Sequence, residues 1–272
     1  MGRREGTTYR LAREDVDRFR AEGWAHLVGV LAEDEVRELE AVYECFLRRE
    51  IPVPGRDFCD MSADYGKPVE QFSIVNVMLP RRWLPAWRGN VYERRAASIA
   101  EQLCGSDMVL DYDQLVAKRP RREDAVFHWH QDLAYWPVTP DTRTASFWLA
   151  LDDATLANGC VRFVSGSHLE PKLRPHRPML GDRDKSHTLV VEVDEACDRI
   201  VPAEIRRGDV TVHHERTIHG SGGNATDGWR RAYIVAFRAR ATVEEERRRG
   251  FTHSHNDALE VLRTVGREEG AV

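Results

Sequence analysis

Residues 127–132 read Phe-His-Trp-His-Gln-Asp (FHWHQD) and predict a β-strand that brings two metal-binding side chains together. In an extended strand, residues two apart lie on the same face, so His130 and Asp132 point together while Gln131 points away. A third ligand must come from a strand that is distant in the sequence and adjacent in space, as a β-barrel provides. His219, which begins the run HGSGGN, is the candidate. The pattern therefore favours a β-barrel that holds a metal ion.

Two histidines and one carboxylate form the ligand set of a mononuclear non-haem iron(II) site. This set occupies one face of an octahedron and leaves three positions open, as an oxygen-activating iron needs for a cosubstrate and for dioxygen. A buried dicarboxylate cosubstrate needs a fixed cation, and arginine binds a carboxylate through two parallel hydrogen bonds. Arg230 lies eleven residues after His219, beyond a glycine-rich turn, in an expected strand from Trp229 to Phe237. We expect Arg230 to supply that cation.

Other histidines compete for the metal positions. His128 lies two residues before His130, so these two residues could form the metal pair instead. Asp132 would then be a buried carboxylate without a partner, which costs free energy. His213 and His214 compete in the same way for the third position, but neither is followed by the glycine-rich turn and the arginine. Packing or hydrogen bonding on a strand is the expected role of that pair.

From about Thr8 to Arg240 the chain resembles the phytanoyl-CoA dioxygenase (PhyH) family of iron(II)- and 2-oxoglutarate-dependent oxygenases. The motifs that carry the resemblance are Gly23-Trp24, Gln114 to Pro120, His128 to Pro137 (HWHQDLAYWP), Asn158-Gly159-Cys160, Ser165 to His168 (SGSH) and His219 to Arg231 (HGSGGNATDGWRR).

The resemblance implies a role for each candidate residue. Lys118 falls in the basic stretch before the metal strand, but its role does not transfer from the family. The implied assignments are iron(II) ligation by His130, Asp132 and His219, binding of the distal carboxylate of 2-oxoglutarate by Arg230, and contact with the cosubstrate by Gln114, Trp148 and Ser221.

Asp132 decides the reaction class within this resemblance. In related halogenating enzymes a small residue replaces the carboxylate, and chloride takes the vacated position on iron. The carboxylate is present here, so the resemblance implies that dioxygen and 2-oxoglutarate are consumed while an unactivated carbon of a small molecule is hydroxylated or closed into a ring. Relatives of this length often tailor secondary metabolites such as sugar-containing antibiotics, which makes such a molecule the expected substrate. An acyl-CoA and an amino acid are the alternatives.

The residues themselves offer two kinds of substrate contact. An acyl-CoA needs a cationic patch for its phosphates, which Arg119, Arg121 and Arg122 could make. A solvated loop is the favoured role of that cluster. The aromatic residues that could stack on a ring or a sugar, or simply pack in the core, are Tyr135, Trp136, Trp83 and Trp87.

A protein of another class would use the same barrel differently. A cupin-like metal-binding barrel that uses His128 and His130, or a binding barrel without a cosubstrate, would have no use for Arg230 or Gln114.

The composition limits the remaining possibilities. The 272 residues are 42% hydrophobic and 31% charged, enough for one large domain with a filled core. A net charge of −5 disfavours a nucleic-acid partner. We find no apolar run that would span a membrane and no secretory signal. Five cysteines at irregular spacing predict neither a zinc site nor disulfides, which favours a reducing cytoplasm. The oligomeric state is not readable from the sequence.

Hydrophobic periodicity predicts one domain over residues 1–272, with a helical buttress at about 10–105 and a jelly-roll core at about 107–240. Short strands at this spacing are typical of a double-stranded β-helix, mainly β with flanking helices. The expected helices are Arg13 to Ala21, Ala32 to Arg49 and Asn90 to Cys104. The expected strands are Trp24 to Val30, Val109 to Ala117, Phe127 to Asp132, Ala145 to Leu151, Gly159 to Val164, Thr188 to Val193, Asp209 to His214 and Trp229 to Arg238.

Three segments depart from this periodicity. Prolines and glycines interrupt residues 51–87, which we expect to be an irregular loop that covers the substrate or connects elements across the barrel. Residues 165–183 are a candidate lid. The charged run from Glu244 to Arg249 is expected to be a solvated helix face.

Overall fold

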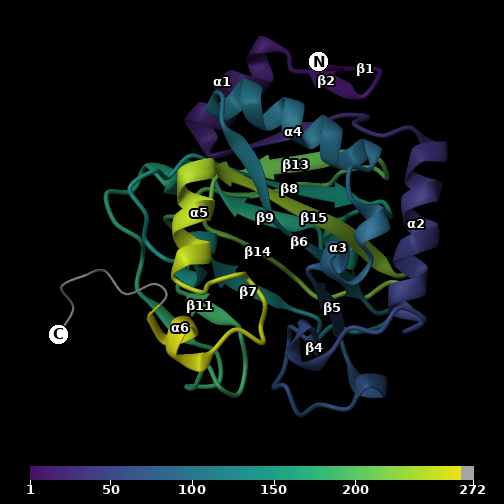
Figure 1. Ribbon diagram of the computed structural model, residues 1–272, viewed down its shortest axis with the longest axis vertical. Coiled ribbons are helices and arrows are strands. Elements are labelled where there is room, and N and C mark those ends of the chain that lie inside the picture. Colours follow the sequence, from purple (N-terminus) through teal and green to yellow (C-terminus); the bar gives the residue numbers. More distant parts are fainter. Residues whose placement is uncertain (265–272) are drawn as a thin grey trace.

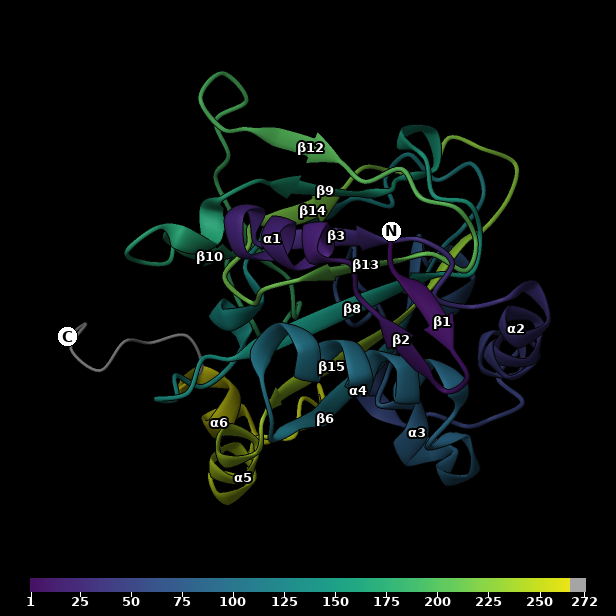
Figure 2. The same cartoon turned by 90° about the horizontal axis from the view of Figure 1, so that it is seen from above.

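The computed structural model describes residues 1–264 as two antiparallel β-sheets packed face to face and flanked by helices (Figure 1). Figure 2 shows strands of the small sheet and strands of the large sheet as separate layers, with α4 against the large one. The N-terminal hairpin packs on α4. The prediction of a double-stranded β-helix, mainly β with flanking helices, is confirmed.

The elements have the following bounds. The seven-stranded sheet runs β3 (Trp24–Leu27), β13 (Val210–His213), β8 (Thr144–Ala150), β15 (Arg230–Ala239), β6 (Met108–Lys118), β5 (Ile74–Met78) and β4 (Phe58–Asp60). The four-stranded sheet runs β12 (Ile200–Pro202), β9 (Val161–Val164), β14 (His219–Ser221) and β7 (Phe127–His130). Two hairpins pair β1 (Arg3–Glu5) with β2 (Thr8–Arg10), and β10 (His176–Pro178) with β11 (Leu189–Val191). The helices are α1 (Arg13–Glu22), α2 (Glu33–Leu47), α3 (Pro80–Trp83), α4 (Val91–Cys104), α5 (Arg240–Arg248) and α6 (Leu259–Thr264).

The three predicted N-terminal helices are present as α1, α2 and α4. Gly23 adopts a φ of 79° and ends α1, a conformation that glycine adopts at little cost. The side chain of Asn90 accepts a hydrogen bond from the backbone N–H of Glu93 at 3.0 Å and so caps the start of α4. α4 packs against β6, β8 and β15 of the large sheet. The helices therefore cover the outer face of the sheet and leave its inner face for the site.

Strand alternation decides which residues face the barrel interior. On β15, Tyr233 packs into the core beneath the helices, whereas Arg230 and Ile234 face inward. Gln114 of β6 and Trp148 of β8 pair directly with Ile234 from either side. Three neighbouring strands thus place side chains predicted to contact the cosubstrate on one inner surface.

The N-terminal segment is less purely helical than predicted. β4 and β5, which were not predicted, lie within residues 10–105 and join the large sheet together with the predicted strand β3. The expected irregular segment 51–87 contains β4, β5 and α3. Every residue of β5 is buried, but its five-residue run between prolines is too short to show strand periodicity. Trp83 and Trp87 belong to the core of this region, where Trp87 stacks on Tyr233 with ring centroids 4.7 Å apart.

Two further predictions need correction. The strand expected at residues 188–193 is shorter and pairs only with β10, outside both large sheets. The run from Glu244 to Arg249 is not wholly solvated, because Glu246 on α5 is completely buried and pairs with Arg238. In residues 1–264, no helix is both long and apolar enough to cross a membrane.

Candidate metal centre and the cavities beside it

Three potential metal ligands converge between the two sheets. β14 pairs with β7 so that His219 lies directly opposite His130. The Nε2 atoms of these two histidines each lie 3.6 Å from Oδ1 of Asp132. The three potential ligand atoms all lie within 4.8 Å of one another, which is compact enough for one shared cation.

Asp132 reaches this position in a different way from the predicted one. β7 ends at His130, and Asp132 is the first residue of a 3-10 turn (Asp132–Tyr135). Gln131 between them is extended, with φ −118° and ψ 131°. That one extended residue is enough to keep both side chains on the same side, so the argument from alternation holds although the strand is shorter.

Backbone carbonyl groups fix the orientation of both imidazoles. Nδ1 of His130 lies 2.7 Å from the carbonyl oxygen of His128, and Nδ1 of His219 lies 3.0 Å from that of Thr217. A carbonyl oxygen can only accept, so each Nδ1 carries the hydrogen and each Nε2 presents a lone pair to the centre. Burial lowers the pKa of His219 well below its usual value and keeps that ring in the neutral form that binds metals.

Neighbouring groups hold the second oxygen of Asp132. Oδ2 accepts a hydrogen bond from Oγ of Ser146 at 3.1 Å and lies 3.2 Å from Nε2 of His213. Burial by itself would raise the pKa of Asp132, but His219, His130 and His213 together hold that pKa well below its usual range. The carboxylate is therefore ionised and oriented before any cation binds.

The competing histidines take other places. His213 touches the centre through Asp132, in the hydrogen-bonding role predicted for it. His214 lies away from the centre, beside the ring of His168 at 5.8 Å. His128 contributes only its carbonyl group, and its imidazole is not among the potential metal ligands found in residues 1–264.

One cavity extends from the triad to Arg230. The side chain of Arg230 is 2% exposed, and its Nε and Nη1 atoms have no hydrogen-bond partner in the described part of the chain. Its guanidinium lies 5.1 Å from the ring centroid of Trp148. Burial lowers the pKa of Arg230 to about 10, so the group remains a cation at neutral pH. A buried cation that faces a cavity without an acid partner indicates an anionic ligand.

Lys118 is a second buried basic side chain at the same end, and no role was predicted for it. It pairs with Arg230 across β6 and β15. Its Nζ donates to Oγ of Ser221 at 2.6 Å and to the carbonyl of Gly222. Burial and the nearby Arg230 lower the pKa of Lys118 well below its usual value. Gly159, at a φ of 81°, makes room for this amine, since a Cβ there would collide with it.

Gln114 marks the boundary between this cavity and a second one. It lines both cavities, and its side-chain amide donates to Oδ1 of Asn76 at 2.5 Å. The buried Asn76 therefore fixes the orientation of Gln114 at the centre of the barrel.

The second cavity lies on the other side of the triad and is largely aromatic. Four of its residues come from the segment after α5, which the sequence interpretation left outside the barrel. The histidine-rich run FTHSH at residues 251–255 was the signal that could have pointed there. Its lining residues are Met61, Met78, Tyr112, Gln114, Phe127, His130, Asp132, Tyr135, Trp136, His187, Phe251, His253, His255 and Leu262.

Comparison with known proteins agrees with this geometry. A profile of the family "Phytanoyl-CoA dioxygenase (PhyH)" matches residues 19–232. Peroxisomal phytanoyl-CoA dioxygenase from Mus musculus is 24% identical over 233 residues, covering 80% of this chain and 66% of the relative. The chain spans 33% to 66% of the length of the first curated relatives that it matches.

Two solved structures resemble the whole barrel. EvdO2 from Micromonospora carbonacea var. aurantiaca, complexed with 2-oxoglutarate, is 30% identical with a TM-score of 0.68, covering 84% of this chain and 91% of that one. SnoK, a non-heme alpha ketoglutarate dependent carbocyclase from nogalamycin biosynthesis, is 26% identical with a TM-score of 0.65, covering 84% of each chain. The chain therefore belongs to the phytanoyl-CoA dioxygenase (PhyH) family of Fe(II)- and 2-oxoglutarate-dependent dioxygenases.

Proposed function

We propose that the protein oxidises an unactivated carbon of a small molecule, by hydroxylation or by oxidative ring closure, using iron(II), 2-oxoglutarate and dioxygen. The observation that carries the proposal is Arg230, a buried guanidinium without an acid partner at the end of a cavity that begins at the triad. A metal-binding barrel without a cosubstrate would have no reason to maintain this cation, because an unpaired buried charge destabilises the fold.

The triad would hold iron(II) through Nε2 of His130, Nε2 of His219 and the carboxylate of Asp132. Bound there, the iron would supply the redox chemistry, while the protein provides orientation and a dry cavity. Iron(II), Asp132 and the dianion of 2-oxoglutarate together carry one excess negative charge, which Arg230 neutralises. Burial and the nearby Arg230 lower the pKa of Lys118, which reduces the cost of a second amine beside that cation.

The remaining predicted residues would shape the cosubstrate cavity. The ring of Trp148 lies 5.1 Å from the Arg230 guanidinium and would help to hold it for the cosubstrate. Ser221 accepts the hydrogen bond of Lys118 and holds that amine beside the cosubstrate carboxylate. Gln114, held by Asn76, would orient groups where the cosubstrate and substrate cavities meet.

We propose a secondary metabolite, such as a sugar-containing antibiotic, as the substrate. The aromatic lining of the second cavity, including Tyr135 and Trp136, suits a ring-bearing molecule. The similarity to the carbocyclase SnoK supports ring closure as one outcome. We further propose a reducing cytoplasm as its location, since all five cysteines are free thiols.

An acyl-CoA or an amino acid is the alternative substrate within the family. The basic cluster that could bind CoA phosphates is already paired, because Arg121 bonds Asp227 at 2.7 Å and Arg122 bonds Asp124 at 2.8 Å. Arg119 lies over the ring of Trp229. These contacts suit the solvated-loop role that is favoured for the cluster.

Anaerobic titration of the apo-protein with iron(II) and then 2-oxoglutarate tests the proposal. We expect a weak, saturable visible charge-transfer band in the wild type and its loss in Arg230→Ala, with iron still bound. Arg13→Ala is the matched control, because that side chain is 90% exposed on α1. Bound iron without a band in the wild type would instead support a cupin-like metal-binding barrel.

The metal ligands are tested separately by equilibrium binding of iron(II). Asp132→Ala should lose far more affinity than Ser146→Ala, which removes only a hydrogen bond to the carboxylate. Removal of such an outer partner typically costs about 10- to 100-fold in metal affinity. Full iron affinity in Asp132→Ala would contradict the ligand set.

A further inference from the structure

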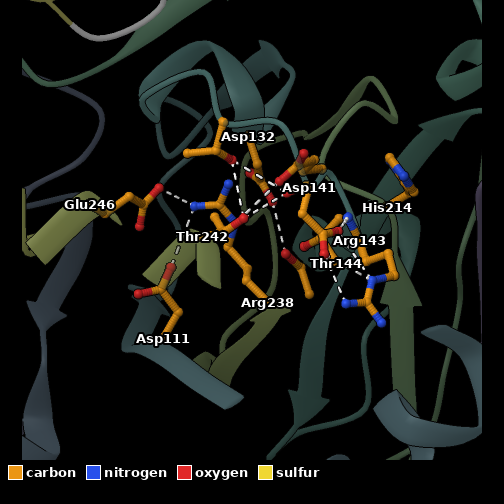
Figure 3. Close-up of polar contacts among 12 residues, drawn as sticks. Asp111, Asp132, Asp141, Arg143, Thr144, His214, Arg238, Thr242 and Glu246 are labelled. Carbon is orange, nitrogen blue, oxygen red and sulfur yellow. Dashed lines mark hydrogen bonds and ion pairs between the residues drawn. The ribbon is translucent and has the colours of Figure 1, made fainter. Parts of the chain in front are cut away.

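A buried network of charges lies behind the second cavity. Arg238, on the inner face of β15, points between Glu246 of α5 and Asp111 of β6 (Figure 3). Its Nη1 pairs with Glu246 and lies 3.5 Å from Asp111, while its Nε lies 3.4 Å from Glu215. All four side chains are at most 1% exposed. This network fastens α5 to the barrel.

His253 connects this network to the cavity. Its Nε2 lies 2.7 Å from Oδ2 of Asp111 and 3.5 Å from Oε2 of Glu246. Its ring stacks on Tyr112 with centroids 4.5 Å apart and lines the cavity. The Nδ1 atom makes no hydrogen bond within residues 1–264. The ring therefore has one nitrogen bonded to the network and one free for a ligand.

The backbone of His253 adopts a strained conformation, which indicates that the surrounding structure holds its side chain in one position. Its φ is 67°, in the left-handed region that residues other than glycine rarely adopt. Such a conformation persists only where the surroundings enforce it, and it often marks a functional position. Here the bonds to Asp111 and Glu246 hold the ring in place.

The charges around His253 favour its cationic form. Burial alone would lower its pKa, but Asp111 and Glu246 raise that pKa above the usual value despite the neighbouring Arg238 and Arg247. The other histidine rings of the same wall differ, because burial lowers the pKa of His187 and lowers that of His255 to about 3.

His253 differs in charge from the other described residues that line the second cavity. The described residues that line this cavity include no lysine or arginine, and Asp132 is the only acid among them. Arg183 lies behind this lining, over the ring of Tyr135. A largely aromatic cavity whose described lining offers one cationic hydrogen-bond donor is suited to an acceptor oxygen on a ring-bearing ligand.

We propose that His253 positions the substrate by donating its Nδ1–H, as an imidazolium held by Asp111 and Glu246, to an acceptor oxygen of the substrate. This inference rests on the proposed function, because it assigns the second cavity to the substrate. It specifies a ring-bearing substrate with a carboxylate, enolate or carbonyl oxygen at this point, and it excludes an ammonium group there.

Matched ring probes of opposite charge test the assignment. Calorimetric titrations of the protein saturated anaerobically with iron(II) and 2-oxoglutarate would use 2-naphthoate and 2-naphthylmethylammonium. The saturating cosubstrate keeps naphthoate away from Arg230. We expect 2-naphthoate to bind about tenfold tighter than the ammonium probe, as one charge-assisted hydrogen bond provides. His253→Gln should abolish that preference.

His255→Gln is the matched control, because it removes a neutral ring from the same cavity and should leave the preference unchanged. Equal binding of the two probes, or a preference that survives in His253→Gln, would overturn the assignment. If the wild type showed no charge-transfer band with iron(II) and 2-oxoglutarate, the proposed function itself would be wrong, whatever the probes showed.

A measurement on the wild type keeps the proposal testable if the variant does not fold. A nitrogen-15 NMR pH titration of the metal-free protein should show that both ring nitrogens of His253 stay protonated to a higher pH than those of an ordinary histidine. Asp111→Asn should shift His253 toward the neutral form. A neutral His253 in the wild type would overturn the proposal.

Discussion

Arg230 and Arg238 lie on the same face of the same strand and have opposite surroundings. Both side chains are buried, at 2% and 0% exposure. Each guanidinium lies over a tryptophan ring, Trp136 for Arg238 and Trp148 for Arg230. Arg238 also contacts the carboxyl groups of Glu246, Asp111 and Glu215, whereas Arg230 faces a cavity and makes no ion pair with a described acid.

The difference separates a structural cation from a ligand-binding one. A buried arginine with acid partners joins elements of the fold, and removing it leaves uncompensated charges. A buried arginine without them is a cost to the folded protein that only a bound anion offsets. The stability of the metal-free protein should therefore respond in opposite directions at these two positions.

The largest effect is expected from Arg238→Met. This change leaves Asp111 and Glu246 buried beside each other without their central cation, which should lower the free energy of unfolding by about 3–5 kcal/mol. Urea denaturation of the metal-free protein at pH 7.5 measures it. An unchanged urea midpoint would show that the network contributes little to stability and would remove one side of the comparison.

Glu215 tests the same network through pH. Burial raises its pKa to about 8, with Arg238 opposing the increase, whereas a glutamate in an unfolded chain titrates near ~4.3. The folded state therefore holds a proton that the unfolded state releases, so this group's stabilising contribution is complete below about pH 4 and is lost as the pH rises toward 8.

Glu215→Gln should remove that part of the pH dependence. Each unit of pKa difference corresponds to about 1.4 kcal/mol, so the variant should gain stability relative to the wild type at pH 8 but not at pH 4. Thermal unfolding at several pH values measures the difference. Glu38→Gln, at an exposed position on α2, should show no such trend; an identical trend in both variants would contradict the buried titration.

These two arginines also show what the sequence could and could not predict. Arg230 is recognisable because its signals are local, a glycine-rich turn and a strand that begins beside it. The partners of Arg238 come from β6, α5 and the segment before β14, and no local pattern connects them. The same reason hides the second cavity, whose wall is completed by residues after α5.

The fold was predicted where periodicity is long and missed where it is short. α2 and β15 show their repeats over many residues, so both were found. β5 is a fully buried strand of five residues between prolines and carries no alternation. Asp132 lies in a 3-10 turn rather than a strand, because β7 ends at His130, the residue that pairs with His219.

Whereas Arg238→Met should destabilise the metal-free protein, Arg230→Met should stabilise it. Replacing an unpaired buried cation with an apolar side chain of similar length should raise the stability of the metal-free protein by roughly 1–2 kcal/mol. Saturating iron(II) and 2-oxoglutarate should then stabilise the wild type by mass action but give the variant no more than iron alone. Thermal unfolding with and without cosubstrate measures both effects, and a destabilised variant would contradict the ligand-binding role of Arg230.

The smallest effect concerns the aromatic neighbour of Arg230. Trp148→Leu keeps the inner face of β8 apolar but removes the ring that lies 5.1 Å from the guanidinium. A desolvated cation–π contact is worth about 1–2 kcal/mol, so 2-oxoglutarate affinity should fall by roughly 5- to 30-fold while iron affinity is retained. Phe147→Leu on the opposite face of β8 is the control, because it packs in the outer core and should lower stability without changing cosubstrate affinity. An equal loss of affinity in both variants would mean that general loosening of β8, and not the stacked ring, positions Arg230 for the carboxylate.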